Sequence, residues 1–258
     1  MKKPALLAAL LGLSLLAGCG ASAGTDASPT PMPPESPADS PTILVDQAPW
    51  FATFRVVAGA ESGELVLAAN DGTSGQVYVL NTEGLPLDGP VENGELINVY
   101  YDAVMESFPC QFSNVSGVEH TETERDDRCG LYLQVLSDLW EVDPGLNTDL
   151  EELAVDFSEL TDLSESEKAA LAYAFGNAHG LMPITGTWEE LVEEGYIDKE
   201  NLLWNGNGCL FTLSGSADGT FRAEKWASGL GAYTFNDCTA QMGEDGDWTY
   251  TVASESIA

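Results

Sequence analysis

The most constraining feature of this sequence is a short apolar run near its N-terminus that ends at a cysteine. Lys2 and Lys3 precede the run (residues 5–16), and two small residues then separate the run from Cys19. A positive start, a short apolar stretch and small residues before a cut are typical of a secretory signal peptide. A membrane-spanning helix needs about 20 apolar residues, so this run is too short to cross a bilayer. We therefore predict a signal peptide at residues 1–18.

The predicted cut site resembles the lipobox of bacterial lipoproteins, because it reads Leu16-Ala17-Gly18-Cys19. In that family the chain is cut before the cysteine, and acyl chains such as palmitate then hold the protein on a membrane. The resemblance implies that Cys19 is the acylated first residue of the mature protein. The implied location is the extracytoplasmic face of the cell membrane, with the lipid bilayer as a partner. The alternative is an ordinary secretory signal in which this cysteine is incidental.

A proline-rich segment follows the lipobox and separates it from the first apolar pattern. Residues 19–48 consist mainly of small and polar residues, and six prolines lie between residues 29 and 41. Proline blocks both helices and the interior of sheets, and so few apolar side chains cannot form a core. We predict a disordered tether that extends by about 3 Å per residue where it is stretched.

The charge of the chain limits its partners. Lys and Arg number 9 against 42 Asp and Glu, which gives a formal net charge of −33. Such a field repels polyanions, so we predict no nucleic-acid partner and favour an envelope protein or a glycan. The plainer alternative is that the acidic surface only keeps the protein soluble. Hydrophobic residues make up 44% of the sequence, which predicts a folded chain after the tether.

Residues 49–121 show short apolar runs separated by turn residues. The five runs predict strands at 54–58, 64–69, 76–80, 96–101 and 111–118. Turn sequences such as Asn70-Asp71-Gly72 favour hairpins between them. Five strands in so short a segment favour a small closed barrel, because closure removes the exposed sheet edges.

A resemblance supports the same barrel. Residues 94–102 (GELINVYYD) and 104–109 (VMESFP) look like a segment of small OB-like domains of unknown function in Firmicutes lipoproteins. The chain departs from that pattern at Ala103, where glycine is usual, and at Cys110. The resemblance implies an OB-like five-stranded barrel, a fold that often binds oligosaccharides or oligonucleotides. The acidic charge favours a structural or protein-contact role instead.

Residues 126–258 predict a second domain of the α+β class with an antiparallel sheet, because helices come first and strands follow. Capping boxes at Ser164 and Thr187 predict the starts of helices at 165–178 and 187–194. The remaining patterns predict a helix at 131–140 and strands at 153–157, 209–213, 220–226, 231–237 and 247–252. Residues 225–233 (KWASGLGAY) resemble the C-terminal region of uncharacterised clostridial lipoproteins, which implies no activity.

The sequence holds few candidates for catalysis. His120 and His179 are the only histidines, and the sequence contains no hydrolase signature, Walker loop or dinucleotide fingerprint. We therefore predict no catalytic residue, metal or cofactor, and a binding or protein-contact module. The alternative is a cell-envelope hydrolase that uses paired carboxylates, such as those among residues 189–194, on a carbohydrate. Helical spacing makes those glutamates more simply a solvated helix face.

Four cysteines remain after Cys19. An even number outside the cytoplasm is compatible with two disulfides, and four cysteines permit three pairings. We predict Cys209 with Cys238, because both lie on predicted strands of one antiparallel sheet, which leaves Cys110 with Cys129. The alternative is four free thiols that act as small buried hydrophobic side chains.

Overall fold

The computed structural model describes residues 50–71 and 75–258 of the chain. The predicted signal peptide, the acylation site Cys19 and the tether lie outside these residues. None of the helices in the described part is long and apolar enough to span a membrane. Residues 47–258 form one compact unit that contains both sheets of the described chain.

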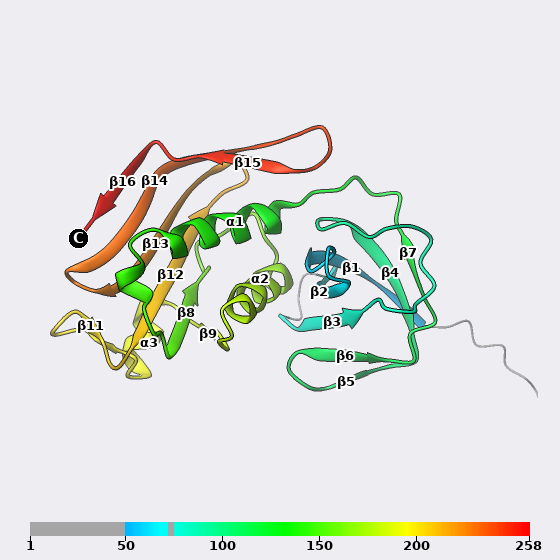
Figure 1. Ribbon diagram of the computed structural model, residues 1–258, viewed down its shortest axis with the longest axis horizontal. Helices are drawn as coiled ribbons and strands as arrows, with labels where there is room; N and C mark the ends of the chain where they lie inside the picture. The colour runs from blue at the N-terminus through cyan, green and yellow to red at the C-terminus, as the bar shows by residue number, and fades with distance from the viewer. Residues whose placement is uncertain (1–49, 72–74) are drawn as a thin grey trace, which may run out of the picture. The chain divides into compact units, whose positions relative to one another are not determined.

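The first sheet has seven strands (Figure 1). They are β1 (Trp50–Ala58), β2 (Glu64–Ala69), β3 (Val77–Asn81), β4 (Leu96–Tyr101), β5 (Ala103–Met105), β6 (Cys110–Ser113) and β7 (Gly117–His120). Their order in the sheet is β5-β6-β3-β2-β1-β4-β7. The pairs are antiparallel except for β3 with β6, which is parallel. The short apolar runs of the sequence thus form the strands of this sheet, and turns connect them.

The structure does not show the predicted five-stranded OB-like barrel. The predicted strand 111–118 is divided into β6 and β7 at Asn114, whose φ of 51° turns the chain out of the extended conformation. The short strand β5 is an additional hairpin partner of β6. Among the described strands no pairing joins β5 to β7, so this sheet is open where a closed barrel was expected.

The second part of the unit contains all the helices of the described chain and nine further strands. The helical elements are α1 (Arg128–Glu141), the 3₁₀ turn η1 (Pro144–Asn147), α2 (Glu165–Ala178) and α3 (Trp188–Glu193). The strands are β8 (Glu152–Asp156), β9 (Ile184–Thr185), β10 (Ile197–Asp198), β11 (Leu203–Trp204), β12 (Gly208–Gly215), β13 (Thr220–Ser228), β14 (Gly231–Met242), β15 (Trp248–Thr251) and β16 (Ser254–Ile257). The fold is α+β.

The second sheet is mixed rather than antiparallel. β12 pairs in parallel with β8 and antiparallel with β13, and β9 pairs in parallel with β8. Parallel neighbours need a long crossover, and α2 and α3 lie in the chain between β8 and β12. The segment with α2 and α3 returns the chain so that β12 runs parallel to β8. The prediction of an antiparallel sheet from the order of helices and strands was therefore wrong.

Both predicted capping boxes are confirmed. The Ser164 hydroxyl accepts a hydrogen bond from the Glu167 amide, and the Glu167 carboxylate accepts one from the Ser164 amide. Thr187 and Glu190 form the same pair at the start of α3. Each box satisfies backbone N–H groups that a helix start leaves without partners, and so fixes where α2 and α3 begin.

One buried core joins the two sheets through α1 and α2. Val57 and Val66 of the first sheet belong to the same apolar cluster as Phe211 and Leu213 of β12 and the buried faces of both helices. Arg55 of β1 also forms an ion pair with Glu167 of α2 at 3.5 Å. The helices therefore cover the inner face of the second sheet and contact the first sheet as well (Figure 1).

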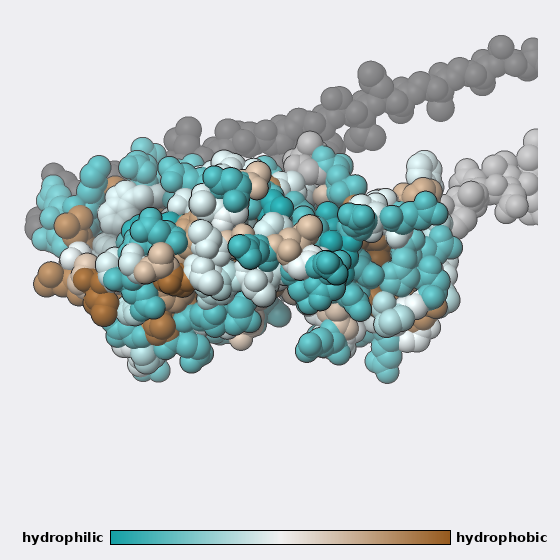
Figure 2. Space-filling model, turned by 90° about the horizontal axis from the view of Figure 1, so that it is seen from above, coloured by the Kyte–Doolittle hydropathy of each residue, from teal (hydrophilic) through white to brown (hydrophobic). Residues whose placement is uncertain are grey.

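Hydrophilic side chains cover most of the face that Figure 2 shows, in keeping with the acidic composition. Apolar side chains gather at the end where β11 and β16 lie in Figure 1. The exposed apolar residues of these elements and the neighbouring β13–β14 turn are Leu202, Leu203, Leu230 and Ile257.

Candidate functional site

The second sheet has two faces of opposite character, and strand alternation assigns each side chain to one of them. On β12, Cys209, Phe211 and Leu213 point into the core shared with α1 and α2. Their neighbours along the strand point to the outer face, because successive side chains alternate. The outer face therefore carries Leu210, Thr212 and Ser214 from β12.

One half of the outer face is apolar and covered. Leu210, Trp226 and Ala154 pack there with Leu191 of α3 and Trp204 of β11. The Trp204 indole N–H donates a hydrogen bond of 2.7 Å to a Glu152 carboxylate oxygen, so its polar group is satisfied. The short α3 and the β10–β11 hairpin thus form a small second core on this half.

The other half of the outer face is polar and uncovered; we call it the polar trough. Its floor comes from β8, β12, β13 and β14 and consists of Asp156, Thr212, Ser214, Arg222, Glu224 and Asn236. Two pockets of about 380 and 980 Å³ lie over it, and Ser158 and Glu159 line both. The two pockets therefore adjoin one another at these residues.

An arginine network lies on the floor of the polar trough. Arg222 Nη2 lies 2.5 Å from Glu224 Oε2, and the same guanidinium donates hydrogen bonds to Asn236 Oδ1 (3.4 Å) and Thr234 Oγ1 (3.5 Å). These three partners come from two neighbouring strands, β13 and β14. The Arg222 side chain is 45% exposed and its two hydrogen bonds are long, so the ion pair with Glu224 is its main contact on the floor.

A tryptophan pair closes one end of the polar trough. Trp188, the first residue of α3, meets Trp226 of β13 with ring centroids 4.5 Å apart and an interplanar angle of 73°. Trp226 is buried, whereas Trp188 remains partly exposed and lines the smaller pocket with Thr212 and Glu224. The Thr187 capping box holds Trp188 in place, because it fixes the first turn of α3.

The polar trough includes Asp156, the last residue of β8, and so reaches the edge where the parallel strands β9, β8 and β12 end. Ligands of parallel sheets commonly bind outside this carboxyl edge. A third pocket of about 300 Å³ opens at the same edge, between the start of α2 and β9, and Glu165 and Lys168 line it. The two trough pockets and this third pocket therefore gather at one side of the second sheet.

The glutamates at 189–194 make different contacts in the structure. Glu190 belongs to the α3 capping box, where hydrogen bonds from Thr187 hold its pKa below the usual value. Glu194 is the C-cap residue of α3. Glu189 alone of this group lines the polar trough, where it joins Asp156, Glu159 and Glu224.

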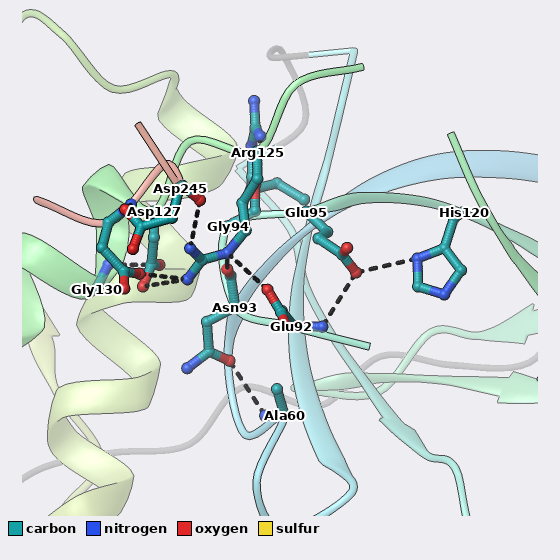
Figure 3. Close-up of polar contacts among 12 residues, drawn as sticks. Ala60, Glu92, Asn93, Gly94, Glu95, His120, Arg125, Asp127, Gly130 and Asp245 are labelled. Carbon is teal, nitrogen blue, oxygen red and sulfur yellow. Dashed lines mark hydrogen bonds and ion pairs between the residues drawn. The ribbon is translucent and has the colours of Figure 1, made fainter. Parts of the chain in front are cut away.

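The two histidines lie elsewhere. His179 is the C-cap residue of α2, as its predicted place at a helix end requires, and it stacks on Trp140 with ring centroids 3.6 Å apart. Burial there lowers its pKa. His120 lies between two carboxylates, with Nδ1 3.1 Å from Glu95 Oε2 (Figure 3) and Nε2 3.3 Å from Asp88 Oδ1. Neither ring is among the residues that line the polar trough.

The polar segment before α1 contains an arginine that joins distant segments of the chain. The Arg125 guanidinium donates hydrogen bonds to the carbonyl oxygens of Asn93 (2.5 Å) and Asp245 (3.0 Å), as Figure 3 shows. Its Nη2 also lies 2.6 Å from Asp247 Oδ1. Asn93 precedes β4, whereas Asp245 and Asp247 lie in the β14–β15 turn. One side chain thus links segments of both sheets.

Asp127 caps α1 beside this junction. Its carboxylate accepts a hydrogen bond of 3.1 Å from the Gly130 amide and lies 3.5 Å from Arg125 Nη2. Burial raises its pKa to about 6, although the arginine and the cap bond act in the other direction. Asp127 is not among the residues that line the trough pockets, so this carboxyl is a structural group at a helix start.

The structure corrects the predicted disulfides. Cys110, Cys129, Cys209 and Cys238 are all free and buried. β13 lies between the strands that carry Cys209 and Cys238, so two strand spacings of about 4.8 Å separate them, more than a disulfide can bridge. Burial raises the pKa of the Cys209 thiol to about 12 and that of Cys238 to about 11, which makes them poor nucleophiles at neutral pH.

Neither a metal site nor a similar known protein indicates what this protein does. Within residues 50–71 and 75–258, no group of three or more His, Cys, Asp or Glu side chains has the arrangement that would hold a metal ion. No protein-family model, no curated protein and no solved structure matches the chain. The polar trough is therefore the feature from which a function can be inferred.

Proposed function

We propose that this protein is a lipid-anchored lipoprotein of the cell envelope that binds a polar ligand in the polar trough. The anchor rests on the lipobox-like sequence at Cys19. The binding role rests on one observation: half of the outer face of the second sheet is polar and uncovered, while the other half is sealed by α3. The tether would give the folded unit reach from the membrane surface.

Three properties of the trough support binding rather than simple solvation. Its two pockets adjoin one another, its arginine is paired with Glu224, and its end is closed by a tryptophan pair. Concave sites with a few fixed polar groups and an aromatic wall are typical of ligand-binding sites. A solvated sheet face needs none of these features.

A second candidate is the envelope hydrolase, and one observation favours it. Asp156, Glu159, Glu189 and Glu224 line the same pocket, and glycoside hydrolysis needs two carboxyl groups across a sugar cleft. Release of reducing ends from oligosaccharides, abolished by Glu224→Gln, would establish this activity. Unchanged oligosaccharides after prolonged incubation would leave binding as the function.

Anchoring is tested by the variant Cys19→Ala in cells. We expect the variant protein to stay as an unprocessed precursor or to leave the membrane, because stable attachment needs two acyl chains at about 0.8 kcal/mol per buried CH₂. Detergent phase partition measures the change, and Cys110→Ala is the matched control. Normal cleavage and unchanged membrane retention of Cys19→Ala would contradict the anchor.

Binding is tested by a thermal-shift screen of chemically varied polar compounds against the full-length protein in detergent. A ligand at 100 times its Kd adds about 2.7 kcal/mol, which raises the Tm of a unit of this size by roughly 5–10 °C. We expect such shifts to disappear in the variant Thr212→Val/Arg222→Ala and to persist in Thr249→Val, whose side chain is exposed on β15. Shifts that survive in the double variant would place binding elsewhere.

A further inference from the structure

We infer that the ligand of the polar trough is an uncharged oligosaccharide, bound in an extended form across the strands. This inference rests on the proposed binding function and names its ligand class. Four observations carry it: the direction and length of the trough, the chemistry of its lining, the tryptophan at its end, and the charge of the protein.

The trough is elongated across the strands. Its lining residues come from β8, β12, β13 and β14 and reach Ser254 at the start of β16. Neighbouring strands lie about 4.8 Å apart, so the four steps from β8 to β16 span about 19 Å. A site of this length suits a linear chain of several rings better than a single small molecule.

The lining supplies both hydrogen-bond donors and acceptors. Residues with hydroxyl side chains line its length: Ser158, Thr161, Thr212, Ser214, Ser216, Thr220, Thr239 and Ser254. The hydroxyl groups of Ser158, Thr161, Ser216 and Thr220 already donate to oxygens of the protein and can still accept from a ligand. Carboxylates accept only, the Arg222 guanidinium donates only, and the hydroxyl groups and the Asn236 amide do both. A sugar hydroxyl likewise donates and accepts, so an oligosaccharide can satisfy each kind of group along the trough. Asp156 and Glu224 already accept from Ser158 and Arg222, so a ligand would meet only the remaining lone pairs of these carboxylates.

Trp188 adds an apolar surface at one end. Its ring is partly exposed and is held by the edge-on contact with Trp226 and by the first turn of α3. Sugar rings have an apolar face of C–H groups between their polar edges, and a large aromatic side chain buries such a face favourably. A rigid ring beside fixed polar groups gives orientation as well as affinity.

Charge separates this ligand class from its competitors. The net charge of −33 repels anionic polymers. A basic peptide would be attracted by the four carboxylates of the smaller pocket, but it would meet the Arg222 guanidinium on the floor of the larger pocket. A neutral ligand avoids both conflicts, and its binding depends little on salt.

The test titrates three neutral tetrasaccharides, maltotetraose, cellotetraose and tetra-N-acetylchitotetraose, into the full-length protein in detergent. Tetralysine and tetragalacturonate are the charged comparison probes. We expect saturable binding of at least one neutral probe by calorimetry at about 10 mM or below, with less than a twofold change between low and high salt. We expect that neither tetralysine nor tetragalacturonate binds in the trough.

Variants then locate the bound sugar. Trp188→Ala should weaken binding about tenfold, and Thr212→Val about threefold, because both side chains line the smaller pocket. The matched controls Trp50→Ala and Thr249→Val change exposed residues of β1 and β15 and should leave affinity within twofold. Trp188→Phe keeps an aromatic ring, so it serves if the alanine variant unfolds, and an intermediate loss is expected.

Each result decides the question. Failure of all three neutral probes at about 10 mM, or binding that Trp188→Phe and Thr212→Val both leave unchanged, overturns the oligosaccharide inference. Salt-dependent binding of tetralysine that Thr212→Val weakens also overturns it, but leaves the proposed binding function standing. A trough that binds none of the screened compounds of any class overturns both.

Discussion

The two faces of β12 differ although they share one backbone. Phe211 and Leu213 are fully buried against the helices, whereas Thr212 and Ser214, their neighbours in sequence, lie on the floor of the polar trough. The inner face contributes stability through buried apolar area, about 25 cal/mol for each Å². The outer face contributes polar groups instead. Substitutions at neighbouring residues of β12 should therefore change either the stability or the proposed binding, and not both.

Lys225 is a strong exception to an apolar inner face, and its loss should have the largest effect. This side chain is fully buried, and its ammonium donates to the carbonyl oxygens of Trp140, Val142 and Asp143 and to Asn147 Oδ1. This cage of oxygens closes the C-terminal end of α1, where backbone carbonyls lack helical partners. Burial lowers the pKa of Lys225, and the surrounding oxygens are the acceptors that a buried ammonium needs.

We expect Lys225→Met to lower the free energy of unfolding by about 3–5 kcal/mol, because it leaves several buried oxygens without donors. Urea unfolding measures the change. The control Lys199→Met removes an exposed lysine and should change stability by less than about 0.5 kcal/mol. A loss below about 1 kcal/mol in Lys225→Met would show that the cage is not a stabilising feature of the inner face.

Leu213→Ala is the direct test of the inner face. Leu213 is fully buried in the core that joins both sheets, so its truncation removes apolar contacts and leaves a cavity. We expect a loss of about 2–5 kcal/mol in urea unfolding. Binding of any trough ligand to the folded variant should stay within twofold of the original value. A stability loss no larger than that of an outer-face variant would contradict the contrast between the faces.

The sequence predicted local structure well where local rules decide it. The helix at 165–178 is confirmed at both ends, because its capping box and the following Gly180, with a φ of 69°, fix its limits. The strands at 64–69 and 96–101 are confirmed residue for residue, because turn residues bound both runs.

Pairing between distant segments was not predictable in the same way. The parallel pair β8–β12 and the separation of Cys209 from Cys238 by β13 depend on strand order, which alternation within a strand does not encode. The polar trough was missed for a related reason. Asp156, Thr212, Glu224 and Asn236 are unremarkable within their own strands and become a site only when four strands lie side by side. Of its residues, Glu189 alone was a candidate from sequence, as one of the acidic run 189–194.

Asp127, at the junction of the two sheets, should make the stability of the protein depend on pH. Its folded pKa of about 6 lies above the usual 3.8, so the stability linked to its protonation is present below pH 3.8 and is lost as pH rises through 6. Between pH 4 and 7 this ionisation should lower stability by up to about 3 kcal/mol. An asparagine side chain in its place cannot titrate, yet its oxygen can still accept from the Gly130 amide.

We therefore expect Asp127→Asn to gain stability relative to the original protein as pH rises from 4 to 7, in urea unfolding at each pH. Glu244→Gln, a change of an exposed carboxylate in the β14–β15 turn, is the control and should show no such trend. A difference between variant and original protein that does not change with pH would show that the pKa of Asp127 is the same in the folded and the unfolded protein.

The smallest effect is expected on the outer face itself. Thr212→Val keeps the branched shape that suits a strand, and Ser214→Ala removes a partly exposed hydroxyl, so neither leaves a cavity or a buried group without a partner. Each should change the free energy of unfolding by less than about 0.5 kcal/mol, against several for Leu213→Ala on the same strand. A loss of more than about 1 kcal/mol in either variant would mean that the trough residues help to hold the sheet together. In that case the polar half of the face would be part of the fold, and its open pockets would no longer argue for a ligand.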